Sequence, residues 1–164
     1  MTKETVQEYS RRITQASPTG LVVITYELID RHLADAEQYS RQWTGTGDET
    51  AAVQYGESIR KARNLLGELI SSLKLEYPVS GELLRIYLYL NRELQLAAIR
   101  KDATLLPRLR GIVQKLGTAF AEVEKTDDSG PVMEHTQRVY AGMTYSKNSL
   151  NEDLVGDFNR GFKV

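Results

Sequence analysis

Four segments of this chain repeat apolar residues at alternating steps of three and four positions. The first follows Ser17 and continues for about seven turns. This spacing places the apolar side chains on one face of an α-helix, whereas a half-buried strand would show strict alternation. Its members are Val22, Tyr26, Ile29, Leu33, Ala36, Tyr39 and Trp43. No strand alternation competes with this pattern, so the sequence predicts an all-α fold.

Three further helices are predicted by the same spacing. A loop at 44–48, rich in glycine and small polar residues, separates the first helix from the second. The second should end at Tyr77-Pro78-Val79, since a residue before proline is disfavoured in the α region. Ser80 is the expected N-cap of the third helix. Asp102 or Thr104 can cap the fourth, with Thr104 preferred because it places Pro107 in the first turn. The three stripes are Ala52, Tyr55, Ile59, Ala62, Leu66, Leu69 and Leu73; Leu83, Tyr87, Leu90, Leu94 and Ala97; and Leu105, Leu109, Ile112, Leu116, Ala119 and Val123.

Four amphipathic helices with short connections are typical of an antiparallel up-down four-helix bundle. We assign residues 17–126 to this bundle and residues 1–16 to a short N-terminal amphipathic helical segment. Residues 127–164 form a C-terminal tail that is too apolar for a solubility tail and too interrupted for a bundle helix. We expect this tail to be partly ordered or to dock on a bundle. Its apolar residues include Met133, Val139, Tyr140, Met143, Tyr145 and Leu150.

The composition argues against catalysis, nucleic-acid binding and membrane insertion. The chain has no cysteine and only 2 histidines, and it contains neither Glu-x-x-His pairs nor a Gly-x-Ser-x-Gly motif. We therefore expect no metal, no cofactor and no enzymatic activity. A net charge of −1 gives no overall attraction to phosphate backbones. No window approaches the ~18 apolar residues of a membrane span, and the N-terminus lacks the apolar region of a signal peptide. We expect a cytoplasmic protein.

The start of the first helix carries a recognisable motif. Ser17 is suited to the N-cap position and Pro18 to the first helical turn. Together with the residues that follow, this motif resembles the FliS family of flagellin-specific export chaperones over roughly Tyr9 to Val123. The resembling positions are Ala16-Ser17-Pro18 with Leu21 and Tyr26; Ile59-x-Lys61-Ala62; Leu65-Leu66-x-Glu68-Leu69; Ser72-Leu73; Tyr87-x-Tyr89 with Arg92 and Leu94; and Lys101-Asp102. Gly20 and Ile86 depart from the family pattern.

The resemblance implies a cytoplasmic chaperone that binds the disordered C-terminal segment of flagellin. Such a chaperone prevents premature polymerisation and delivers the subunit to the flagellar export apparatus. The N-terminal motif region then supplies candidate partner-binding residues, namely Tyr9, Ile13, Ala16, Ser17, Pro18, Leu21 and Tyr26. On the second helix, whose apolar side is wider than a surface helix needs, the best candidates for a groove are Ile59, Ala62, Leu66 and Ile70, although these positions also suit a core.

Other readings of the same pattern stay open. The wide apolar rows would also serve an oligomerising structural or regulatory bundle without flagellin as cargo. A second copy of the chain, forming a homodimer, and components of the export gate are further candidate partners.

Overall fold

The computed structural model describes residues 3–132 of the chain. They form helices without a strand, so the predicted all-α class is confirmed. The helices are α1 (Lys3–Gln15), α2 (Pro18–Thr46), α3 (Glu49–Ser72), α4 (Pro78–Arg100) and α5 (Leu106–Glu124). The first corresponds to the predicted N-terminal segment, and the other four to the predicted bundle.

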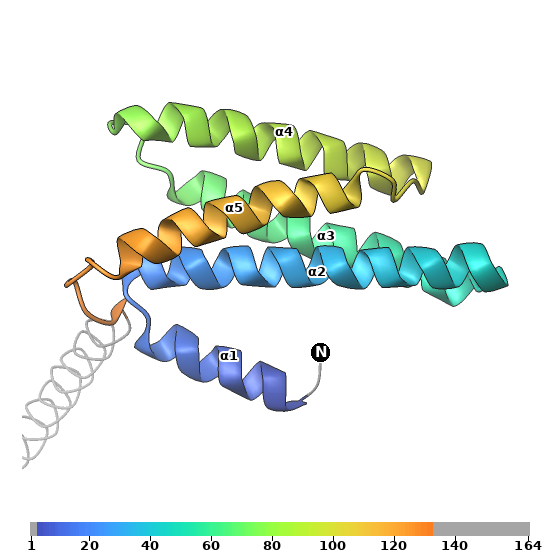
Figure 1. Ribbon diagram of the computed structural model, residues 1–164, viewed down its shortest axis with the longest axis horizontal. Coiled ribbons are helices and arrows are strands. Elements are labelled where there is room, and N and C mark those ends of the chain that lie inside the picture. The colour runs from blue at the N-terminus through green and yellow to red at the C-terminus, as the bar shows by residue number, and fades with distance from the viewer. Residues whose placement is uncertain (1–2, 133–164) are drawn as a thin grey trace, which may run out of the picture. The chain divides into compact units, whose positions relative to one another are not determined.

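The chain is divided into two compact units, and the larger one comprises Thr19–Asp127. Within it, Figure 1 shows α2 to α5 as a bundle whose chain direction reverses at each connection. In the smaller unit, α1 is amphipathic, and the guanidinium of Arg12 lies 5.4 Å from the centre of the Tyr9 ring. The same unit has a hydrogen bond from the Val132 N–H to the Ala16 carbonyl at 3.1 Å.

The core of the bundle is built mainly from the predicted stripes, except on α5, where Leu106 and Val113 are buried and Leu105 and Val123 of the predicted stripe are exposed. One side chain from each helix illustrates this: Leu33, Leu66, Leu94 and Leu109 are all fully buried. Burying such a side chain contributes about 1.5 to 3 kcal/mol relative to leaving it in water. The buried cluster comprises Tyr26, Ile29, Leu33, Ala36, Tyr55, Ile59, Ala62, Leu66, Leu69, Leu83, Tyr87, Leu90, Leu94, Ala97, Leu106, Leu109 and Val113.

The first connection is shorter than predicted, because α2 continues to Thr46 through most of the expected loop. The Thr46 hydroxyl donates to the carbonyl of Gln42 at 2.8 Å, so the last turn is held by a side chain as well as by the backbone. Gly47 then ends the helix with a φ of 70°, a left-handed conformation that glycine adopts without steric cost. Asp48 caps α3 by accepting the N–H of Thr50 at 2.9 Å.

The prediction that Ser80 caps the third helix is wrong. The helix begins at Pro78, Tyr77 occupies the N-cap position in an extended conformation, and Ser80 is buried inside the first turn. Proline explains the difference, since it fixes a helical φ and lacks the N–H that would otherwise need a partner. The preceding helix ends at Ser72, several residues before the proline.

Neither Asp102 nor Thr104 caps the fourth bundle helix, contrary to prediction. The Asp102 carboxylate instead accepts the N–H of Thr104 at 2.9 Å, closing a turn before the helix begins. Leu105 is the N-cap and Pro107 is the second helical residue. The turn therefore uses the polar side chain that the sequence assigned to the helix start.

A candidate partner-binding groove

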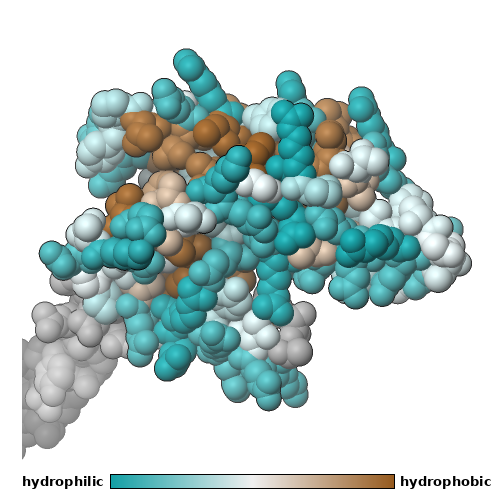
Figure 2. Space-filling model, in the orientation of Figure 1, coloured by the Kyte–Doolittle hydropathy of each residue, from teal (hydrophilic) through white to brown (hydrophobic). Residues whose placement is uncertain are grey.

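An apolar groove of about 270 Å³ opens at the end of the bundle where α3 ends and α4 begins. All four bundle helices and the α3–α4 connection contribute to its walls. We call this site the α3–α4 groove, and its lining residues are Val22, Leu69, Ser72, Leu73, Lys74, Tyr77, Val79, Ser80, Leu83, Tyr87 and Phe120. Figure 2 shows hydrophobic residues gathered along α4 and between α4 and α5 on the face turned to the viewer.

We call the exposed apolar residues at the α3–α4 connection and the start of α4 the rim: Tyr77 and Val79 line the groove, and Leu75 lies two residues before Tyr77 in the chain. Leu75, Tyr77 and Val79 keep 67%, 54% and 58% of their surface exposed. The chain leaves α3 at Leu73, so Leu75 and Tyr77 lie in the connection and cannot join a helical stripe facing the core. Val79 lies in the first turn of α4 and is exposed there. A cluster of large exposed apolar side chains beside a hollow is the usual mark of a surface that a partner covers.

The floor of the groove is aromatic and uncharged. Tyr87 from α4 is buried, and its hydroxyl is hydrogen-bonded to the hydroxyl of Tyr26 from α2. The Tyr26 ring also contacts Phe120 of α5, with 5.5 Å between the ring centres. Burial raises the pKa of both tyrosines above the ordinary value. The floor therefore presents apolar surface and one internally satisfied polar pair at neutral pH.

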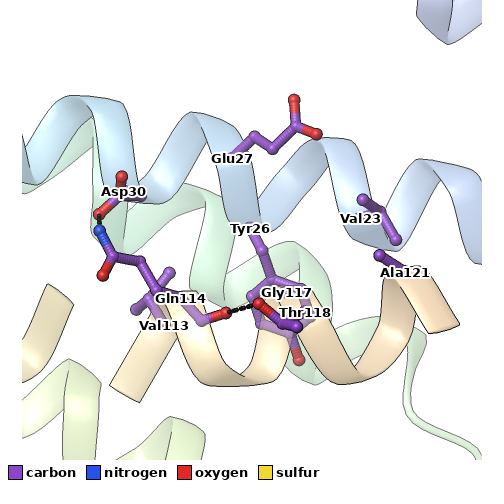
Figure 3. Close-up of a pocket in the computed structure, with 9 residues that line it drawn as sticks. All are labelled: Val23, Tyr26, Glu27, Asp30, Val113, Gln114, Gly117, Thr118 and Ala121. Carbon is purple, nitrogen blue, oxygen red and sulfur yellow. Dashed lines mark hydrogen bonds between the residues drawn. The ribbon is translucent and has the colours of Figure 1, made fainter. Parts of the chain in front are cut away.

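A second cavity, of about 280 Å³, lies between α2 and α5 on the other side of Tyr26. Figure 3 shows that small side chains of α5 border it opposite Val23 and Glu27 of α2. Gly117 allows the close approach of the two helices, because a Cβ atom at this position would lie 3.2 Å from the Cβ of Tyr26. Its lining residues are Val23, Tyr26, Glu27, Asp30, Val113, Gln114, Gly117, Thr118 and Ala121.

The polar edge of this second cavity is engaged in the bundle's own contacts. Arg110 donates to Asp30 at 2.9 Å and to Glu37 at 3.1 Å, joining α5 to α2. Gln114 donates to the same Asp30 carboxylate at 3.1 Å, as Figure 3 shows. Hydrogen bonding to Asp30 is the main cause that raises the pKa of Arg110. The polar side chains on this side of α2 therefore hold α2 and α5 together. The α3–α4 groove is the better candidate for a partner-binding site.

The described residues hold no cluster of ligands that could bind a metal ion, and none of the described helices is long and apolar enough to cross a membrane. Tyr55 is the other buried tyrosine of the core, and its hydroxyl donates to the carbonyl of Ala97 at 3.1 Å. Burial raises the pKa of Tyr55 to about 12. These buried polar groups are satisfied by structural partners.

The residues predicted from sequence to bind a partner lie mostly elsewhere. Tyr26, Ile59, Ala62 and Leu66 are buried in the core, with at most 1% of their surface exposed. The remaining candidates differ in exposure. Ile70 and Leu21 are half-buried, as are Tyr9, Ile13 and Ser17, whereas Ala16 is buried and Pro18 is exposed.

Sequence reasoning missed the residues that line the groove at its rim. The available signal was the run of alternating apolar residues around a proline, at Leu73, Leu75, Tyr77 and Val79. This run interrupts the helical period, and from this interruption alone only a helix end is predicted. Apolar residues that a turn cannot bury are themselves an indication of an interaction surface.

Comparison with known proteins places most of the chain in one family. Residues 1–127 match the family model described as Flagellar protein FliS. No curated protein matches the chain. The matched region includes all five helices and every residue of the α3–α4 groove.

Proposed function

The chain belongs to the FliS family of flagellar export chaperones, and from this premise we propose that it binds the disordered C-terminal segment of flagellin in the cytoplasm. Binding would keep the subunit from polymerising early and support its delivery to the export apparatus. The family is one of chaperones and not of enzymes, so no reaction is required. The observation that carries the proposal is the α3–α4 groove with its exposed apolar rim.

The shape of the groove suits an amphipathic segment that becomes ordered when it binds. Such a segment places a few apolar side chains into a hydrophobic groove while its polar face stays in water. A groove of about 270 Å³ accepts only some of those side chains, so the rim residues Leu75, Tyr77 and Val79 must cover others. Because the segment loses conformational entropy on binding, its affinity is limited, and release at the export apparatus is correspondingly easier.

We propose that two of the residues predicted from sequence extend this surface. Leu21 and Ile70 are half-buried and directly adjoin the groove residues Val22 and Leu69 along the chain. We include them in the proposed contact area. The α1 residues Tyr9 and Ile13, with Ala16, Ser17 and Pro18, remain proposed contacts that rest on the resemblance to the family.

Calorimetry with a peptide of the cognate flagellin C-terminus tests the proposal. We expect binding with a clearly negative heat-capacity change, because apolar surface on both partners leaves water. Val79→Asp should weaken binding by at least about tenfold, which corresponds to about 1.4 kcal/mol. Val53→Asp is a matched control, because Val53 is 63% exposed and does not line the groove.

Three outcomes would contradict the proposal. Flagellin lacking its C-terminal segment would bind as well as the full-length protein, or the two valine variants would lose affinity equally. Alternatively, the chain alone would change size with concentration and leave the flagellin peptide unbound. That last result would favour the oligomerising bundle, and a homodimer would then be the species to characterise.

A further inference from the structure

The family match ends at residue 127, but the chain continues to Val164. Residues 133–164 lie outside the described residues, and their amino-acid composition includes several large apolar side chains. They contain Phe158 and Phe162, two of the 3 phenylalanines of the chain, and Met133 and Met143, two of its 3 methionines. Segments that serve only as solvated tails are poor in aromatic and large apolar residues. This composition indicates that the apolar side chains of the tail bind an apolar surface.

The bundle unit ends at Asp127, at the same end of the bundle as the α3–α4 groove. The carboxylate of Asp127 accepts the N–H of Thr19 at 3.2 Å, which ties the end of the bundle to the first turn of α2. Val22, which lines the groove, lies in the following turn of α2. Phe120, which lines it from the other side, lies in the last two turns of α5. The chain therefore leaves the bundle beside the groove.

We propose that residues 133–164 of the C-terminal tail occupy the α3–α4 groove of their own molecule through Val139, Tyr140 and Met143, and thereby compete with the export cargo. The competition rests on the proposed function, whereas the docking does not. The connecting residues impose no limit of reach, since an extended chain covers up to ~3.5 Å per residue and Val139 is about a dozen residues past Asp127. Tethering gives the tail an effective concentration in the millimolar range, so even weak contacts fill the groove.

The proposal has a quantitative consequence for flagellin binding. The apparent dissociation constant equals the intrinsic one divided by the fraction of molecules with an open groove. If the tail fills the groove in about 70% to 90% of molecules, removing its anchors tightens cargo binding by about three- to tenfold. Only a cargo segment that binds tightly enough to displace the tail would then occupy the groove.

Cross-linking tests the docking without any cargo, because the chain has no native cysteine. Lys74→Cys places a thiol in the groove, and Ala141→Cys places one between the proposed anchors in the full chain. A short bismaleimide should join this pair within one molecule. The control pairs Ala141→Cys with Glu49→Cys, which lies in a separate cavity bordered by the first turns of α3 and the end of α4. Adding Val79→Asp should reduce the first cross-link severalfold.

Either of two results would overturn the docking. One is equal cross-linking of the groove pair and the control pair, and the other is a groove cross-link that forms only between two molecules. Competition is measured separately with full-length Tyr140→Ser/Met143→Ser, which should bind the flagellin C-terminal peptide about three- to tenfold more tightly. Unchanged affinity would overturn the competition, while a groove cross-link without any flagellin binding would support docking and contradict only the proposed function.

Discussion

The hydrogen bond between Tyr26 and Tyr87 predicts a strong coupling between two single substitutions. Both side chains are 1% exposed, and each hydroxyl has the other as a partner. Tyr26→Phe leaves the Tyr87 hydroxyl buried without this partner, and Tyr87→Phe does the reverse. Each should cost about 1 to 3 kcal/mol, because an unpaired buried hydroxyl loses its hydration and gains nothing in exchange. The double variant removes both hydroxyls and should cost no more than about 1 kcal/mol.

Urea unfolding followed by circular dichroism measures the three variants against the parent chain. The dependence of unfolding free energy on urea should stay constant, since none of the substitutions changes the surface exposed on unfolding. A destabilisation of 1 kcal/mol should lower Tm by roughly 4 °C. The coupling energy between the two sites should be at least about 1 kcal/mol. Additive costs would refute the reasoning, because they would mean that neither hydroxyl depends on the other for its hydrogen bond.

Three further predictions concern the stability of the bundle. Arg110→Met should destabilise it by about 1 to 2 kcal/mol, because the Asp30 and Glu37 carboxylates lose a cation while partly buried; chemical denaturation with Arg110→Lys as the milder comparison measures this. Gly67→Ala should stabilise the protein by about 0.5 to 1 kcal/mol, since a Cβ there meets nothing within 4 Å, whereas Gly117→Ala should gain nothing because of its contact with Tyr26. The contribution of Tyr55 to stability should be constant below about pH 10 and be lost between pH 10 and 12, because tyrosine ionises near 10 in the unfolded chain and Tyr55 only at about 12 when folded; Tyr55→Phe should make the alkaline fall in stability shallower.

The core could be predicted from the sequence because helical periodicity is a property of the backbone alone. Ile29 and Leu33, or Leu90 and Leu94, share a face in any α-helix, and burying that face is the main source of bundle stability. Their complete burial confirms the predicted stripes of α2 and α4. On α5 the predicted stripe is wrong at Leu105 and Val123, which are exposed, whereas Leu106 and Val113 are buried. The same reasoning predicts that Tyr26 lies on the buried face, but it cannot identify the Tyr87 hydroxyl on α4 as the hydrogen-bond partner of Tyr26.

Helix ends and pairwise polar contacts could not be predicted in the same way. Ser80 and Asp102 have the chemistry of N-caps, but a neighbouring proline in one case and a local turn in the other decided where the helix begins. Contacts such as Arg110 with Glu37, or Thr19 with Asp127, join residues far apart in sequence. Choosing among many charged residues for such pairs requires the packed arrangement of the helices.

The location of the α3–α4 groove separates binding from stability in a way that a core site would not. Leu66 and Leu94 are fully buried in the chain alone, so the core of the bundle is complete without a partner. Leu83 lines the groove but is only 8% exposed, and replacing it would disturb folding and binding together. Val79 and Tyr77 line the same groove with more than half of their surface in solvent, so their substitution removes little folding energy. A loss of cargo binding in these rim variants, with an unchanged melting curve, would therefore report on the groove itself.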